Sequence, residues 1–220
     1  VNDLLVQGAM PIGLSLGLVI EEGMLFCELM KILDSVKKLS ARYKIPVVTG
    51  DTKVMPKGKV DKIIINTSGV GIGVQGDRKI VPGDKIIVSG GLGEHAVALL
   101  SKRFDYETDI ISDCKPLVDE FLKISRYVKA AKDPTRGGLA ACLNEMAERF
   151  GVGICIEDES VPVKRQVEKV IDMLGLDLFA LASEGRFVGI FDEKVSEKVV
   201  GKLKTFNKDA CVIGEVVKGN

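Results

Sequence analysis

The apolar positions of the first 70 residues switch between helical and strand-like spacing. They predict a short helix over residues 2–9, which Met10-Pro11 ends, and a strand from Ile12 to Ile20. A longer helix follows, because apolar residues then recur three and four apart: Leu25, Leu29, Ile32, Leu33, Val36 and Leu39. Two β-rich segments, residues 47–49 and 62–67, are predicted strands on either side of a polar loop, Gly50-Asp51-Thr52-Lys53.

The rest of the chain alternates strands and helices more regularly. Strands are predicted over residues 85–89, 153–157, 186–191 and 210–217, and helices over residues 94–103, 116–127, 138–150, 163–174 and 195–206. This order predicts an α/β or α+β layered protein. Glycines 69, 71, 73 and 76, with Pro82-Gly83, interrupt the pattern. We therefore expect an incomplete N-terminal domain over residues 1–79 and a second domain over residues 80–220.

Composition narrows the possible partners. The 220 residues carry 31 Lys plus Arg and 31 Asp plus Glu, so the net charge is zero. Nucleic acid is not an expected partner, because phosphate binding needs a basic surplus. No apolar run reaches the roughly 18–20 residues of a membrane span, so no membrane association is expected. The chain begins at Val1 without a signal-peptide pattern, which suggests a piece of a longer protein.

The five cysteines, an odd number without a CxxC pair, fit free thiols in a reducing compartment, and we expect a cytoplasmic protein. The single histidine, His95, excludes a metal site built on several histidines. Magnesium or calcium would have to bind carboxylates. His95 itself, in the first turn of a predicted helix, is expected to be structural or at the surface.

Two glycine-rich loops deserve comparison. Residues 71–76 match GxGxxG after a strand, but Asp77 to Gly83 cannot form the helix that a dinucleotide fold requires. These glycines are expected at a hinge or a closely packed strand end. Gly90 to His95 joins a predicted strand to a predicted helix, so it is either an anion-binding helix start or a tight turn. No P-loop motif occurs.

Three polar segments could carry chemistry. Asp51 and Lys53 place a carboxylate beside a lysine, and Asp51 with Asp3 could hold Mg²⁺ through carboxylates alone. The segment Asp133 to Gly138 precedes a helix, so Arg136 could bind an anion there, or Thr135 could simply cap the helix. Ser183-Glu184-Gly185-Arg186 offers another carboxylate at the start of a strand. The alternative for the first and third segments is a solvated surface charge, and for the second it is helix capping with a surface salt bridge.

Eight short segments, taken together and in their order along the chain, indicate a protein family more specifically than any one of them does alone. They are Val1 to Leu4, Val48 to Val54, Ile65 to Gly69, Ser89 to His95, Ser112 to Cys114, Asp133 to Ala140, Ala182 to Gly185 and Ile213 to Val216. This series resembles the HypE family, the hydrogenase-maturation carbamoyl dehydratases of the aminoimidazole-ribonucleotide-synthetase-like superfamily. The resemblance covers nearly all of the chain.

The resemblance implies a two-domain, PurM-like ATPase that forms a homodimer through strands of its N-terminal domain. It implies ATP-dependent dehydration of a C-terminal cysteine S-carboxamide to a thiocyanate, which supplies cyanide for [NiFe] hydrogenase. The implied partners are the carbamoyltransferase HypF and the HypC–HypD complex.

By the same resemblance, Asp3 and Asp51 would bind Mg²⁺–ATP, and Lys53 and Glu184 would flank the reacting carboxamide. The remaining implied residues would line the cleft near the nucleotide or the tail: Asp133, Thr135, Arg136, Gly137 and Gly138.

Two features of the family are missing from the sequence. There is no Pro-Arg-Ile-Cys-type tail, and the N-terminal segment with further nucleotide ligands is absent. The last cysteine, Cys211, falls in a predicted core strand and is expected to be structural. Two other hypotheses stay open: another ATP-using enzyme of the superfamily, such as a selenophosphate, thiamine-phosphate or purine-synthesis enzyme, and a non-catalytic maturation scaffold. ATP turnover distinguishes the scaffold from the enzymes.

Overall fold

The computed structural model of the chain describes residues 1–73 and 78–219, which divide into two compact units. The small unit comprises Val1 and Ala9–Gly73. The larger unit comprises Asn2–Gly8 together with the chain from residue 78 onward. The chain therefore begins the larger unit, leaves it to build the small unit, and then returns.

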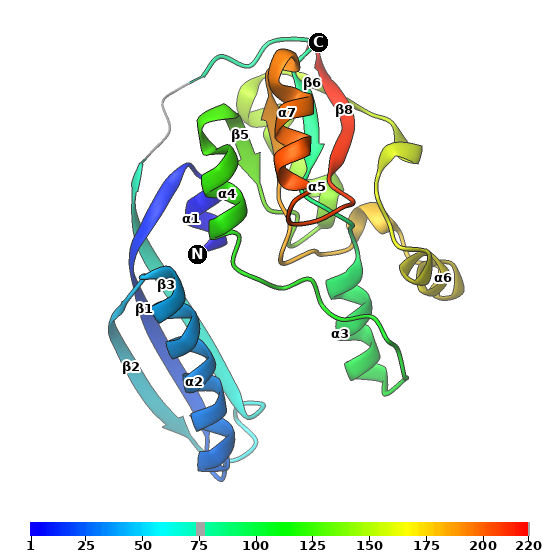
Figure 1. Cartoon of the computed structure of the whole chain (residues 1–220). Coiled ribbons are helices and arrows are strands. Elements are labelled where there is room, and N and C mark those ends of the chain that lie inside the picture. The colour runs from blue at the N-terminus through cyan, green and yellow to red at the C-terminus, as the bar shows by residue number, and fades with distance from the viewer. Residues whose placement is uncertain (74–77, 220) are drawn as a thin grey trace. The chain divides into compact units, whose positions relative to one another are not determined.

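The small unit is a three-stranded sheet with one helix. Its elements are β1 (Ala9–Glu21), α2 (Phe26–Tyr43), β2 (Val47–Met55) and β3 (Ile63–Gly73). The strand order is β2-β1-β3, with β1 parallel to β2 and antiparallel to β3. Helix α2 lies along this sheet (Figure 1). The predicted helix and strands are confirmed, although β1, β2 and β3 all extend beyond the predicted ranges.

The predicted polar loop from Gly50 to Lys53 is wrong, because these residues lie inside β2. They pair in register with Leu16 to Val19 of β1, and that long-range pairing outweighs the low strand propensity of glycine and aspartate. Local sequence could not reveal it, since the partner strand lies more than 30 residues away.

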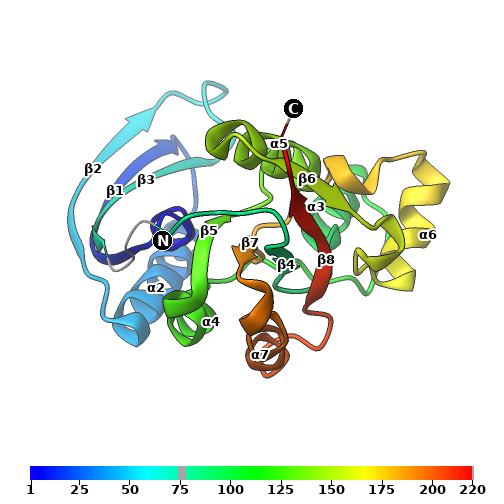
Figure 2. The ribbon, with the colours of Figure 1, turned by 90° about the horizontal axis from the view of Figure 1, so that it is seen from above.

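The larger unit is built on a five-stranded antiparallel sheet of order β5-β7-β4-β8-β6. The strands are β4 (Lys85–Val88), β5 (Val128–Lys132), β6 (Gly153–Ile156), β7 (Val188–Phe191) and β8 (Cys211–Val217). The helices are α1 (Asn2–Val6), α3 (Glu94–Phe104), α4 (Val118–Ile124), α5 (Gly138–Phe150), α6 (Arg165–Leu174) and α7 (Glu193–Leu203). Short 3₁₀ turns occupy Ser125–Tyr127, Asp158–Ser160 and Leu178–Ala180. Figure 2 shows α5 on one side of this sheet and α4 with α7 on the other.

Side-chain alternation along the strands supplies both faces of this sheet with apolar residues. On one face Ile86, Val88 and Ile190 pack in a cluster with Leu139 and Met146 of α5. On the α4 side, Phe121 meets the buried Phe187 edge to face, with ring centroids 5.7 Å apart. The central strands are therefore buried on both faces, which explains their continuous apolar sequence.

The structure adds one strand and shortens several helices. Strand β5 was not predicted, and the predicted helix over residues 116–127 is α4 followed by a 3₁₀ turn. Of the GxGxxG segment, residues 74–76 lie outside the described part of the chain. Gly71 lies in β3, where an added Cβ would come 3.0 Å from the carbonyl oxygen of Met10, so it is a closely packed strand glycine. In residues 1–73 and 78–219, no helix combines the length and apolarity needed to cross a bilayer.

Candidate functional site

Asp51 and Lys53 lie on one face of β2 in the small unit. Asp51 pairs with Gly17 and Lys53 with Val19, and residues two apart on a strand point to the same side of the sheet. Both are exposed, and the Asp51 carboxylate accepts the N–H of Thr52 at 2.8 Å. This face of the small unit therefore offers a carboxylate and an ammonium group to a ligand.

The segment from Asp133 to Gly138 connects β5 to α5 in the larger unit. Thr135 does not cap the helix: the N-cap residue is Gly137, and the Thr135 carbonyl accepts the N–H of Gly138 at 3.0 Å. The helix begins at Gly138, as predicted, and the residue before it takes the cap position in place of Thr135. Arg136 is exposed, and Asp133 is half-buried.

Gly138 brings this segment against the chain that leads to Ser183. It has a φ of +63°, and an added Cβ would lie 2.4 Å from the carbonyl oxygen of Phe179, so only glycine fits. The N–H of Ser183 donates to the carbonyl of Pro134 at 2.9 Å. Two predicted site segments, Asp133–Gly138 and Ser183–Arg186, are therefore adjacent within the larger unit.

The carboxyl group of Asp133 lies within the electrostatic influence of Asp3 in the larger unit. Burial raises the pKa of the Asp133 carboxyl, and the negative charge of Asp3 raises it further. Two carboxylates that repel each other fit a divalent cation, and Mg²⁺ characteristically takes one or two carboxylates and completes its shell with water and phosphate. In residues 1–73 and 78–219 no cluster of three or more His, Cys, Asp or Glu side chains could hold a metal ion.

Glu184 is half-buried, and its backbone is held on both sides. The N–H groups of Glu184 and Gly185 both donate to Oδ1 of Asp113, at 3.0 and 3.1 Å. The side-chain amide of Asn2 donates through Nδ2 to the backbone carbonyl of Glu184 at 3.1 Å and to that of Lys115 at 3.0 Å. The predicted catalytic carboxylate therefore belongs to a fixed turn.

The negative charges around this turn affect the pKa of the Cys114 thiol. Partial burial raises its pKa, and the carboxylates of Glu184 and Asp113 raise it further. A thiol with a raised pKa carries little thiolate near neutral pH and is a poor nucleophile. Cys114, an exposed free cysteine, is therefore not expected to act as a nucleophile near neutral pH.

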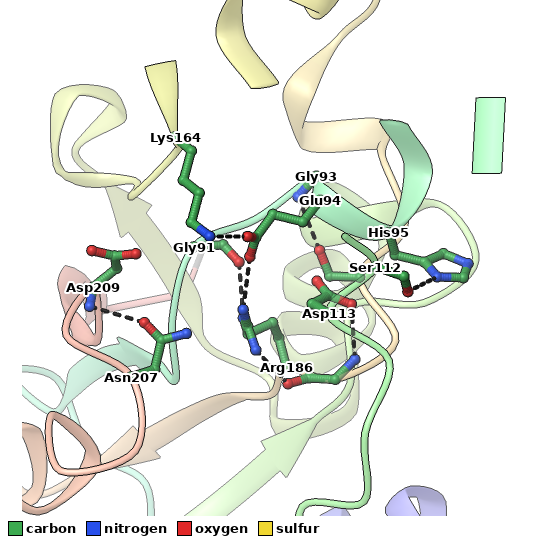
Figure 3. A network of polar contacts seen from close by, with 12 residues as sticks. Gly91, Gly93, Glu94, His95, Ser112, Asp113, Lys164, Arg186, Asn207 and Asp209 are labelled. Carbon is green, nitrogen blue, oxygen red and sulfur yellow. Dashed lines mark hydrogen bonds and ion pairs between the residues drawn. The ribbon is translucent and has the colours of Figure 1, made fainter. Parts of the chain in front are cut away.

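The polar groups at the start of α3 bond to other residues of the larger unit (Figure 3). The buried Glu94 accepts from the guanidinium of Arg186 at 2.8 Å and also pairs with Lys164. The N–H of Gly93 donates to the Ser183 hydroxyl at 3.0 Å. Gly93 has a φ of +81° and its N–H already has a partner, so the geometry favours the tight-turn alternative for this loop. His95 has a structural contact, with Nδ1 2.9 Å from the Ser112 hydroxyl.

Sequence reasoning missed three residues that organise the site: Asn2, Asp113 and Arg186. Arg186 donates to the carbonyls of Gly91 and Gly185 as well as to Glu94. The available signal was position alone, since Asn2 precedes Asp3, and Asp113 lies within a segment that carries the resemblance.

Two family models match the chain. The N-terminal domain of AIR synthase related proteins matches residues 1–73, and the C-terminal domain matches residues 81–220. The class is thus a two-domain AIR synthase related protein, and the predicted PurM-like architecture is confirmed.

Individual relatives narrow the class. The carbamoyl dehydratase HypE of Escherichia coli is 38% identical over 99% of this chain, which covers 68% of that protein. A crystal structure of the hydrogenase maturation protein HypE in complex with ATP has a TM-score of 0.93 and 34% identity, covering 99% of this chain and 68% of that one. A HypE–HypF complex has a TM-score of 0.90 and 37% identity, covering 97% and 74%. The chain belongs to the HypE family, as its motifs indicated.

The chain spans about two thirds of the length of the curated relatives it matches: 68%, 65% and 66% of three of them.

Proposed function

We propose that this chain is part of an ATP-dependent carbamoyl dehydratase that converts a C-terminal cysteine S-carboxamide to a thiocyanate for hydrogenase maturation. Support comes from its membership of the HypE family, since the Escherichia coli relative is named a carbamoyl dehydratase and another HypE binds ATP. The observation that carries the proposal in this chain is the fixed turn at Glu184, which lies against the Asp133–Gly138 segment.

The chemistry explains why such a site uses these residue types. An amide oxygen is a poor leaving group, so it first attacks the γ-phosphorus of ATP, which releases ADP while one N–H proton goes to a base. Loss of the second N–H proton then breaks the C–O bond, releases phosphate and leaves the C≡N group. We assign the base to Glu184 and stabilisation of the developing charge, or a proton relay, to Lys53.

We propose that Mg²⁺ binds with ATP, where it would neutralise charge on the phosphate oxygens. The resemblance assigns Asp3 and Asp51 to it. Asp3 belongs to the larger unit and Asp51 to the small one, so their pairing on one ion rests on the resemblance alone. Within the larger unit, the raised pKa of Asp133 beside Asp3 fits a cation there. Thr135, Arg136, Gly137 and Gly138 are proposed to lie near the nucleotide or the tail.

We further propose that residues 1–79 form the ATP-binding and dimerisation domain and residues 80–220 the second domain. Dimerisation through the small unit is supported by its many exposed apolar strand residues: Val48, Val54, Ile64, Val70 and Ile72, each 54–66% exposed. A surface of this kind marks an interaction site. HypF is a proposed partner because a related HypE forms a complex with it, and the HypC–HypD complex is proposed from the resemblance. The free cysteines suit the reducing cytoplasm.

The test uses the full-length protein, carbamoylated on its tail cysteine, with ATP and Mg²⁺. Phosphate release and the mass loss of one water on dehydration are followed together. Glu184→Gln and Lys53→Met should each lower the rate by about a hundredfold or more, the usual contribution of a general base or a charge stabiliser. Asp109→Ala, an exposed carboxylate of the larger unit, is the matched control and should leave the rate unchanged.

Two results count against the proposal. Wild-type protein that neither releases phosphate nor forms thiocyanate supports a scaffold. Normal turnover in either variant removes that residue from the mechanism.

A further inference from the structure

Asp113 is a buried carboxylate in the segment that leads from α3 to α4. Only 7% of its surface is exposed, and one oxygen, Oδ1, accepts the two successive N–H groups of Glu184 and Gly185. Figure 3 shows the Asp113 carboxylate in the same polar network as Arg186 and Glu94. Two adjacent N–H groups that converge on one point form an anion cradle, and here the anion is a side chain of the protein itself.

The contact is tight on the backbone side as well. A Cβ added to Gly185 would lie 1.7 Å from the carbonyl oxygen of Asp113, so no other residue allows this approach. Asn2 closes the opposite side, because it donates to the carbonyl of Glu184 and accepts the N–H of Leu117 at 3.0 Å. The peptide groups on both sides of the Glu184 Cα are therefore fixed by side chains that are distant in sequence.

No structural role accounts for the second carboxylate oxygen of Asp113, Oδ2. Oδ2 is buried and, among the residues that the structure describes, has no hydrogen-bond partner. A buried, half-satisfied carboxylate is costly, and an asparagine would supply the same Oδ1 acceptor without a charge. What the charge adds is strength, since hydrogen bonds to an ionised acceptor are about twice as strong as neutral ones.

The geometry points to Asp113 as the positioning residue for Glu184: its carboxylate clamps the two peptide groups that flank the Glu184 Cα and so sets where the Glu184 carboxylate reaches. Asp113 acts through the backbone and does not touch the substrate. The catalytic consequence of this inference rests on the proposed function. The hydrogen bonds of the clamp do not depend on that function.

The test compares Asp113→Ala, Asp113→Asn and the control Asp109→Ala in the full-length carbamoylated protein. Asp113→Ala should lower kcat by about a hundredfold, the penalty of a displacement near 1 Å at a reacting group, while the KM for ATP stays within about twofold. Asp113→Asn keeps the acceptor, so its kcat should be only about threefold to tenfold lower than that of wild type. An Asp113→Ala enzyme with wild-type kcat, or a loss confined to KM, overturns the proposal.

Hydrogen exchange supplies a readout that needs no catalysis. In wild-type protein the amides of Glu184 and Gly185 should be protected, and Asp113→Asn should speed their exchange about tenfold or more while the amides of β4 are unchanged. If Asp113→Ala does not fold, Asp113→Asn decides, and unchanged kcat together with unchanged exchange overturns the clamp. If wild-type protein forms no thiocyanate, the proposed function fails, and the exchange rates still test the clamp separately.

Discussion

The buried ion pair between Arg186 and Glu94 allows a stability prediction of definite size. Both side chains are less than 10% exposed, at 7% and 5%, and Arg186 makes three hydrogen bonds of 2.8–3.0 Å. Arg186→Met keeps the bulk but leaves a buried carboxylate. Removing one partner of such a pair costs about 3–5 kcal/mol. Because Lys164 still contacts Glu94, we expect the lower end, about 3 kcal/mol.

Thermal and urea unfolding followed by circular dichroism measure this loss. For a chain of this size, about 3 kcal/mol corresponds to a fall of roughly 6–12 °C in Tm. Lys164→Met is the matched control: its side chain is 51% exposed, so its loss should stay below about 1 kcal/mol. Glu94→Leu combined with Arg186→Met should recover most of the stability, since no buried charge is left alone. Equal, small losses for Arg186→Met and Lys164→Met would refute the reasoning.

Three further predictions address the same unit. Gly138→Ala should cost about 2 kcal/mol or more in urea unfolding, because of its positive φ and a carbonyl contact, whereas Gly201→Ala in α7, where a Cβ meets nothing within 4 Å, should be neutral or stabilising. Alkylation of Cys114 at pH 8, measured by peptide mass, should be slower than that of free cysteine. It should become faster in Glu184→Gln, because removing that negative charge lowers the thiol pKa. An unchanged rate in Glu184→Gln would show that the charge of Glu184 does not affect the Cys114 thiol. The raised pKa of Asp133 means that its protonated form favours folding and that this contribution is lost as pH rises through the folded pKa. Asp133→Asn should therefore be more stable than wild type at pH 7 without Mg²⁺, with the difference vanishing in acid; a wild-type advantage at pH 7 would contradict the sign.

Helical periodicity predicted the elements of the larger unit well, whereas short strands depended on their partners. Strand β5 was missed because Val-Lys-Ala-Ala-Lys has little strand propensity of its own. It forms because it pairs with β7, and because Lys129 reaches the buried carboxylate of Asp84 at 2.6 Å. Neither partner is near in sequence, so no local pattern could have shown the strand.

The candidate site was predictable as residue types and not as contacts. The resemblance pointed to Glu184, which the structure places next to the Asp133–Gly138 segment. The residues that hold Glu184 lie 71 and 182 positions away, at Asp113 and Asn2. Hydrogen bonds over such separations follow from the tertiary fold, and one sequence without its fold carries no periodic trace of them.

The pairing of Ala9 with Gly73 has a consequence for how the chain folds. These residues open and close the small unit, and they are direct neighbours across β1 and β3. The small unit therefore acts as an insertion whose entry and exit are side by side, as in proteins that tolerate domain insertion. Once its sheet has formed, the two ends of the small unit are held together, so joining α1 to the rest of the larger unit no longer requires the closure of a long loop. Unformed, the same stretch would be a loop of roughly 65 residues, with a correspondingly larger closure entropy.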